Sequence, residues 1–292
     1  MLDHLLSAIC YLLFGSELSG ELPIRMTRPL CLLSLVAAIF LGGCAFRSAV
    51  EISRSAATTD DARFWESVRA ADVVYVGEVH DDQNNHQYEL ELVRGALARH
   101  LQIAIGWEMF TRSQQPSLDR FDRHKISLEE LLSQTGFQRS WGVYSPLYAK
   151  ILGLNSEMHV RNIGLNAAND LVHRVARGET LSPEEQDQLP EGYAVSSRAY
   201  GNFIRLMGDH PGITDSDLRR YFNAQNVWDQ TMADSIVAFH QHNAKTKLIV
   251  FTGRGHIQNG FGIPSYLAQK SKLKQLLLFP PTKNDVTNQK AV

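Results

Sequence analysis

The sequence contains 292 residues, of which 44% are hydrophobic, so the chain can bury a full core. Its formal net charge is −2, and no run rich in Lys and Arg is interleaved with aromatic residues. This balance argues against a disordered protein, and we expect no nucleic-acid partner.

The N-terminal part of the sequence predicts a targeting segment. Residues 1–25 carry Asp3 and have no basic residue ahead of their apolar stretch, so we expect translation to start at Met26, with 1–25 an upstream mis-start. From there Arg28 precedes an apolar run, 30–41, that is too short to span a bilayer. This arrangement predicts a signal peptide over residues 26–43.

The residues Leu-Gly-Gly-Cys at 41–44 resemble a bacterial lipobox. The resemblance implies that Cys44 becomes the lipidated first residue and that the protein is attached to a membrane through a lipid anchor. Ala45 after the cysteine favours the outer membrane, and residues 44–61 are expected to form a polar tether. The alternative is an ordinary signal peptide with an incidental cysteine.

The cysteines limit the chemistry of the mature protein. The chain has only Cys10, Cys31 and Cys44, and processing would leave Cys44 alone. The folded domain would then have no thiol for a nucleophile, a disulfide, a thiolate metal site or a covalent haem attachment. Any cofactor must be held by His, Tyr, Met, Glu or Asp.

Short apolar segments alternate with helical patterns from residue 72 onward. A helix is predicted over 83–100, and strands are predicted over 72–78, 102–109, 159–166, 245–253 and 275–280. Such alternation predicts an α/β fold with a mainly parallel sheet flanked by helices on both faces.

The connection between the third and fourth strands is too long for a simple crossover. Helical patterns cover 182–189, 193–207 and 215–240. We therefore predict a small inserted α-helical subdomain over 179–240. The α/β domain is expected to consist of residues 62–178 and 241–282.

Polar residues follow three of the predicted strands, and the carboxyl ends of parallel strands meet at one edge of a sheet. They are Glu78, His80, Glu108, Arg254 and His256. Imidazole and carboxylate groups bind zinc, manganese or iron, and an open coordination position would activate water. The pattern is compatible with a metal-dependent hydrolase in which His80 and His256 bind the metal. Glu108 or Glu78 would act as ligand or base, and Arg254 would polarise a carbonyl group.

Each of these residues also has a structural interpretation. Glu78 and Glu108 at strand ends can cap helix N-termini, and Arg254 can pair with either carboxylate. His86 lies on the inward stripe of the first predicted helix and can be a core histidine.

Five blocks occur in the order found in the ChaN family of haem-binding lipoproteins, which they resemble. The blocks are VGEVHDDQNNHQYEL, IGWEMF, AQNVWDQTMA, TGRGH and GFGIPSYL. The resemblance implies an α/β domain with a small helical domain. It also implies haem bound between two subunits in iron uptake or storage, with a tyrosine on the iron, an assisting histidine and possibly an outer-membrane haem receptor as partner.

The resemblance does not fix the haem ligand. Tyr200 falls where family members often have a tyrosine, and Tyr193 and Tyr148 are alternatives. His210 or His173 would be the accessory histidine, and Arg198 and Arg205 are available to favour a phenolate. We therefore predict a haem-binding outer-membrane lipoprotein that forms a homodimer on haem binding.

The same blocks resemble the wider superfamily of Tiki metalloproteases and erythromycin esterases. Tiki-like enzymes carry two Gly-x-x-His motifs with glutamates, and this chain has such motifs at 77–80 and 253–256. Metal-dependent hydrolysis at the strand ends is thus the alternative prediction.

Overall fold

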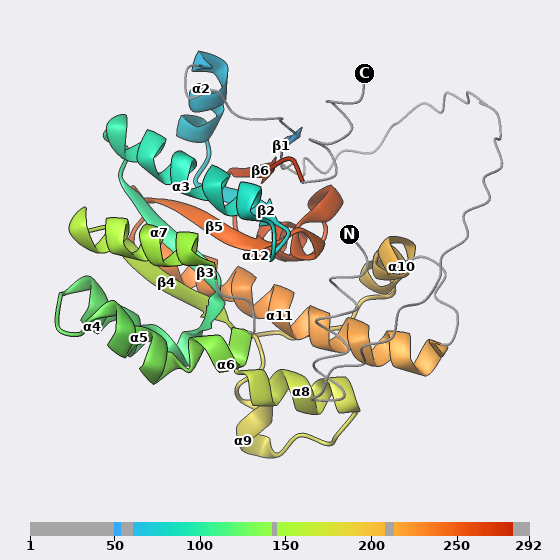
Figure 1. Ribbon diagram of the computed structural model, residues 1–292. Helices are drawn as coiled ribbons and strands as arrows, with labels where there is room; N and C mark the ends of the chain where they lie inside the picture. The colour runs from blue at the N-terminus through green and yellow to red at the C-terminus, as the bar shows by residue number, and fades with distance from the viewer. Residues whose placement is uncertain (1–49, 54–60, 142–144, 208–212, 283–292) are drawn as a thin grey trace, which may run out of the picture.

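The computed structural model describes residues 50–53, 61–141, 145–207 and 213–282 (Figure 1). Within these ranges six parallel strands form one sheet in the order β1-β6-β2-β5-β3-β4. The strands are β1 (Val50–Ser53), β2 (Val73–Glu78), β3 (Ile103–Thr111), β4 (Arg161–Asn166), β5 (Lys247–Gly253) and β6 (Gln275–Phe279). The predicted α/β fold with a parallel sheet flanked by helices is confirmed.

Alternate residues of each central strand pack into opposite layers. In β2, Val74 and Val76 join one hydrophobic core, while Val73 and Tyr75 join the core on the other face. All six residues of β2 are buried, as expected for a strand covered on both sides. In the register of β2 with β5, Glu78 lies opposite Gly253, so the two strands end side by side.

Helices cover both faces of the sheet. The helices packed on one face are α2 (Ala62–Ala70), α3 (Gln83–Ala98), α4 (Gln115–Asp122), α5 (Leu128–Thr135), α6 (Phe137–Trp141) and α7 (Pro146–Glu157). The other face is covered by α11 (Asp215–His242) and α12 (Ile263–Lys270).

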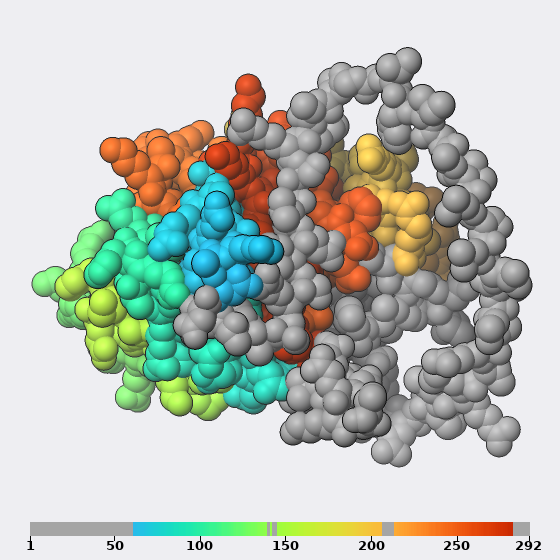
Figure 2. Space-filling model, turned by 90° about the horizontal axis from the view of Figure 1, so that it is seen from above, coloured from blue at the N-terminus to red at the C-terminus, as the bar shows by residue number. Residues whose placement is uncertain are grey.

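Four helices connect β4 to β5, in the region where an insertion was predicted. They are α8 (Asn169–Arg177), α9 (Pro183–Gln186), α10 (Ser197–Met207) and α11. The C-terminal half of α11 packs on the sheet through Met232 and Ile236, whereas its N-terminal half contacts α8 and α10. Helix α10 thus lies at one side of the molecule in both views (Figure 1, Figure 2).

The segment predicted as a polar tether, 44–61, contains β1, which pairs with β6 at the edge of the sheet. Cys44, the upstream residues 1–25 and the signal segment 26–43 lie outside the described residues. Among the helices that are described, none has the length and apolar character needed to cross a membrane.

Candidate functional site

The first half of the site forms where β2 meets α3. Glu78 is the last residue of β2, and Asp82 caps the N-terminus of α3 four residues later. Between them His80 turns back, so that its Nδ1 lies 2.7 Å from Glu78 Oε1. The Tyr148 hydroxyl of α7 donates to the same oxygen at 2.5 Å. One carboxylate oxygen of Glu78 is therefore held by donors from two directions.

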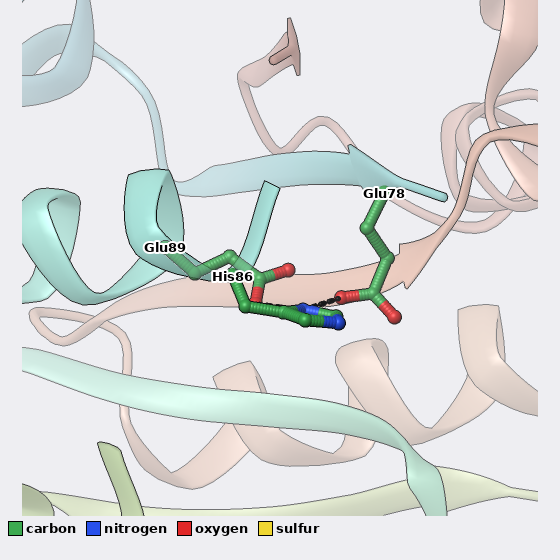
Figure 3. A group of neighbouring side chains, drawn as sticks. All are labelled: Glu78, His86 and Glu89. Carbon is green, nitrogen blue, oxygen red and sulfur yellow. Dashed lines mark hydrogen bonds and ion pairs between the residues drawn. The ribbon is translucent and has the colours of Figure 1, made fainter. Parts of the chain in front are cut away.

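Helix α3 adds His86 and Glu89, which share one face of the helix because they are three residues apart. His86 Nε2 donates to the main-chain carbonyl of His80 at 2.9 Å. Its Nδ1 lies 3.2 Å from Glu89 Oε2 and 3.3 Å from Glu78 Oε2 (Figure 3). His86 and Glu89 are each 0% exposed. An imidazole thus faces two carboxyl groups in a fully buried setting.

The second half of the site surrounds Glu108 in β3. Glu108 Oε2 accepts from Thr252 Oγ1 at 2.7 Å and from the Gly253 amide at 2.6 Å. Its Oε1 lies 3.2 Å from Nε2 of His256, which belongs to the 3-10 helix η2 (Arg254–His256). His256 Nδ1 lies 2.5 Å from Asp229 Oδ1 on α11. The imidazole of His256 is therefore enclosed by a carboxylate at each ring nitrogen.

Gly253 brings the two halves together. A Cβ atom at this position would lie 2.8 Å from His80 Nε2 and 3.6 Å from His256 Cδ2, so both rings pack against the end of β5. Trp141 contacts the His80 ring edge to face, with 4.8 Å between centroids. The His80 side chain is 25% exposed, whereas the side chains of Glu108 and His256 are only 6% exposed. His80 is thus the member of the network that solvent reaches.

The charges of the second half are fixed by mutual interaction. Burial alone would lower the pKa of His256, but the carboxylates of Glu108 and Asp229 outweigh it and raise that pKa to about 10. Burial would raise the pKa of Glu108, but His256 outweighs it and lowers that pKa to about 2. Glu108 and His256 therefore form a buried ion pair at neutral pH.

The first half behaves differently because it has more carboxyl groups than cations. Burial, and then the negative charge of Glu78, raise the pKa of Glu89 well above its usual range. The pKa of Glu78 itself is lowered, since hydrogen bonds from Glu89, His80 and His86 outweigh the effect of burial. Without a bound cation, Glu89 is the carboxyl group that holds a proton.

Arg254 contacts main-chain atoms on both sides of β2. Its Nε donates to the Gly77 carbonyl at 3.2 Å, and its guanidinium group also donates to the carbonyl of Pro280. Asn166, at the end of β4, donates to the main-chain carbonyl of Glu108 at 3.0 Å. The residues predicted to meet at the strand ends are therefore brought together, while their assignment to metal binding or catalysis remains a prediction.

Several members of this network were not identified from the sequence. Asp229 and Gln225 lie on α11, and Gln225 Nε2 is 2.8 Å from His256 Nδ1. Their stripe was interpreted as packing, although the spacing of four residues between Gln225 and Asp229 was a usable signal. Glu89 has a similar signal, because it follows His86 by three residues on one helix face.

The haem ligands suggested by the family lie away from this network. Tyr200 is half-exposed on α10, its hydroxyl lies 3.5 Å from Asp215 Oδ1, and the Arg219 guanidinium lies 4.6 Å from its ring centroid. Tyr193 packs against the core between α8 and α11 and donates to the Asn223 carbonyl at 3.4 Å. Burial is the main factor that raises the pKa of both tyrosines.

The remaining haem candidates occupy varied positions. Tyr148 is buried in the first half of the network, where it donates to Glu78. His173 is partly buried on α8, and Arg198 and Arg205 are exposed on α10. His210 lies outside the described residues.

Comparison with known proteins places this architecture. A family described as haem-binding uptake, Tiki superfamily, ChaN matches residues 64–267. The structure described as cofacial heme binding to ChaN of Campylobacter jejuni has a TM-score of 0.60 and 17% identity, covering 76% of this chain and 86% of that one. An erythromycin esterase, EreC, in its open conformation has a TM-score of 0.45 and 14% identity, covering 73% of this chain and 71% of that one.

A protein of Arabidopsis thaliana, RETICULATA-RELATED 5, chloroplastic, is 25% identical over 238 residues, which are 75% of this chain. The chain spans only 32% of the length of that relative. The family match covers more than half of the chain, from the core residues of α2 to those of α12. The chain therefore belongs to the haem-binding uptake family of the Tiki superfamily, the family of ChaN.

Proposed function

We propose that this protein is a haem-binding lipoprotein of the bacterial outer membrane that holds haem for uptake or storage between two copies of the chain. Family membership supports haem binding, and the lipobox supports the anchor. The structural observation that carries the proposal is the accessible hydroxyl of Tyr200 on α10, beside cationic side chains. Iron in haem would supply the Lewis acid that a phenolate ligand requires.

The surroundings of Tyr200 fit such a ligand. Its hydroxyl has a long contact of 3.5 Å to Asp215, an exposed side chain that can turn away. A Cβ atom on the neighbouring Gly201 would have nothing within 4 Å, so a flat group can approach the helix closely there. Arg198 and Arg205 lie exposed on the same helix, where they can meet carboxylate groups of a porphyrin.

A second copy follows from the size of this helix. The side chains of Phe203 and Ile204 on α10 pack with Phe222 of α11, which leaves little apolar surface of the helix free for a porphyrin. A haem held by one short helix would keep one apolar face in water, and such a face favours association. We therefore expect haem to bring two chains together.

Titration of the unlipidated mature domain with haem tests the proposal. Absorption spectra would report ligation, and analytical ultracentrifugation would report dimerisation. Tyr200→Phe keeps the ring and removes the oxygen, so it should remove the tyrosinate charge-transfer band and weaken binding at least tenfold. Tyr193→Phe is the matched control and should bind as the unaltered domain does. If both variants keep the original spectrum, the ligand lies elsewhere.

Hydrolysis is the second candidate function, because His80 combines partial exposure with a carboxylate partner. The 2.7 Å contact of its Nδ1 with Glu78 leaves Nε2 as the atom available for proton transfer. His256 is less suited to bind a metal here, since a carboxylate lies at each of its ring nitrogens. Assays with activated esters, with and without added divalent metal, should detect turnover that His80→Gln abolishes. Equal rates for both proteins would remove this candidate.

A further inference from the structure

We propose that Glu78, His86 and Glu89 form a buried binding site for a divalent transition-metal cation, independent of the haem-binding segment. Each residue offers one ligand atom, and these atoms all lie within 4.8 Å of one another. Figure 3 shows the two carboxyl groups converging on the imidazole from β2 and α3. One nitrogen and two carboxylate oxygens suit Zn²⁺, Mn²⁺ or Fe²⁺.

The orientation of His86 is that of a metal ligand. Its Nε2 donates to the carbonyl of His80 at 2.9 Å, which assigns the proton to that nitrogen and leaves a lone pair on Nδ1. Histidines that bind metals generally donate their other ring nitrogen to a carbonyl or carboxylate in this way. The lone pair faces Glu78 Oε2 and Glu89 Oε2, which are acceptors themselves. A cation between the three atoms would resolve this opposition.

Two carboxylate oxygens of the group lack donors. Glu78 Oε2 and Glu89 Oε1 are buried and have no hydrogen-bond partner among the described residues. Both point into the group, toward the imidazole and toward each other (Figure 3). Buried polar atoms normally find partners, so two unpaired oxygens at one place indicate a missing positive charge. A divalent cation would balance two carboxylates and a neutral imidazole.

The surrounding contacts hold Glu78 ready for this role. Tyr148 and His80 both bind its Oε1, at 2.5 and 2.7 Å, which leaves Oε2 facing the group. The neighbouring cluster of Glu108 and His256 offers no comparable opening. Glu108 Oε2 already accepts two hydrogen bonds, and a carboxylate lies at each ring nitrogen of His256. The unpaired acceptors therefore single out the cluster at the start of α3.

The test uses the haem-free mature domain, stripped with a chelator and dialysed against Zn²⁺ or Mn²⁺. Elemental analysis should find about one ion per chain, and the ion should raise the melting temperature. Glu89→Gln keeps the size of the side chain and removes its charge, so it should weaken metal binding at least tenfold. Asp229→Asn, a buried carboxyl group of the other cluster, is the matched control and should bind as the unaltered domain does.

Three results would overturn the proposal. They are a stripped domain that takes up no metal and shows no thermal shift, a Glu89→Gln variant that binds normally, and binding lost only in Asp229→Asn. If Glu89→Gln fails to fold, Co²⁺ loaded into the unaltered domain decides the question. Visible absorption bands of Co²⁺ with nitrogen and oxygen ligands would support the site, and their absence would refute it. Because no step uses haem, failure here leaves the proposed haem binding untouched.

Discussion

The buried ion pair of Glu108 and His256 should make the stability of the fold depend on pH. The pKa of His256 is about 10 in the folded protein, against an ordinary value of 6.5. Because the folded value is the higher one, the stabilisation is fully present below pH 6.5 and is lost as the pH rises toward 10. At about 1.4 kcal/mol per pKa unit, the difference sets an upper limit of about 5 kcal/mol.

The substitution His256→Gln removes the cation and keeps a polar side chain. It leaves Glu108 and Asp229 buried without their shared positive partner, which should cost about 3 to 5 kcal/mol near neutral pH. Urea unfolding at pH 6 to 10 would measure this cost. The difference between the two proteins should shrink as the pH rises, because the unaltered protein loses its advantage.

A matched control is His240→Gln. His240 is also buried, but its ring nitrogens contact the main-chain carbonyls of Ile236 and Asp72. This variant should show no comparable change of its destabilisation with pH. A destabilisation by His256→Gln that stays constant from pH 6 to 10 would refute the assigned ion pair. The same slope in His240→Gln would assign the effect to burial of histidine in general.

Two further predictions concern other parts of the chain. Cys44→Ala should release the protein from the membrane fraction of expressing cells, and equal retention of both proteins would place the anchor elsewhere. Gly253→Ala should destabilise the fold by about 1 to 3 kcal/mol in urea, because its methyl group would lie 2.8 Å from His80 Nε2. Gly153→Ala is the control, since a Cβ atom at that helical position meets nothing within 4 Å and should slightly stabilise the protein. Similar losses in both variants would contradict the close packing at Gly253.

The five central and C-terminal strands were predictable because each is a short apolar run bounded by polar or turn residues. Both faces of the sheet are covered, so these runs are continuous rather than alternating. The edge strand β1 was missed, since its four residues follow a polar segment and acquire a partner only from β6, more than two hundred residues later. Long-range pairing of so short a segment leaves no local pattern.

The meeting of Glu78, His80, Glu108 and His256 was also predictable, because parallel strands bring their carboxyl ends to one edge. The charge state of the cluster was not. It depends on Asp229, which arrives from the middle of α11 with the same helical period as the packing residues around it. A sequence pattern records the period of a helix but does not say which polar side chain meets a histidine from a distant loop.

Helix α11 links the two candidate sites and makes them separable by experiment. One turn carries Phe222, whose ring packs 5.3 Å from that of Tyr200, and the next turn carries Gln225, which contacts His256. A change that displaces the helix would therefore disturb both places, so truncations within 179–240 cannot assign a function to either. Substitutions that keep the shape of a side chain avoid this problem. Tyr200→Phe alters only the outer turn, and Glu89→Gln alters only the cluster beneath α3, so haem binding and metal binding can be lost one at a time.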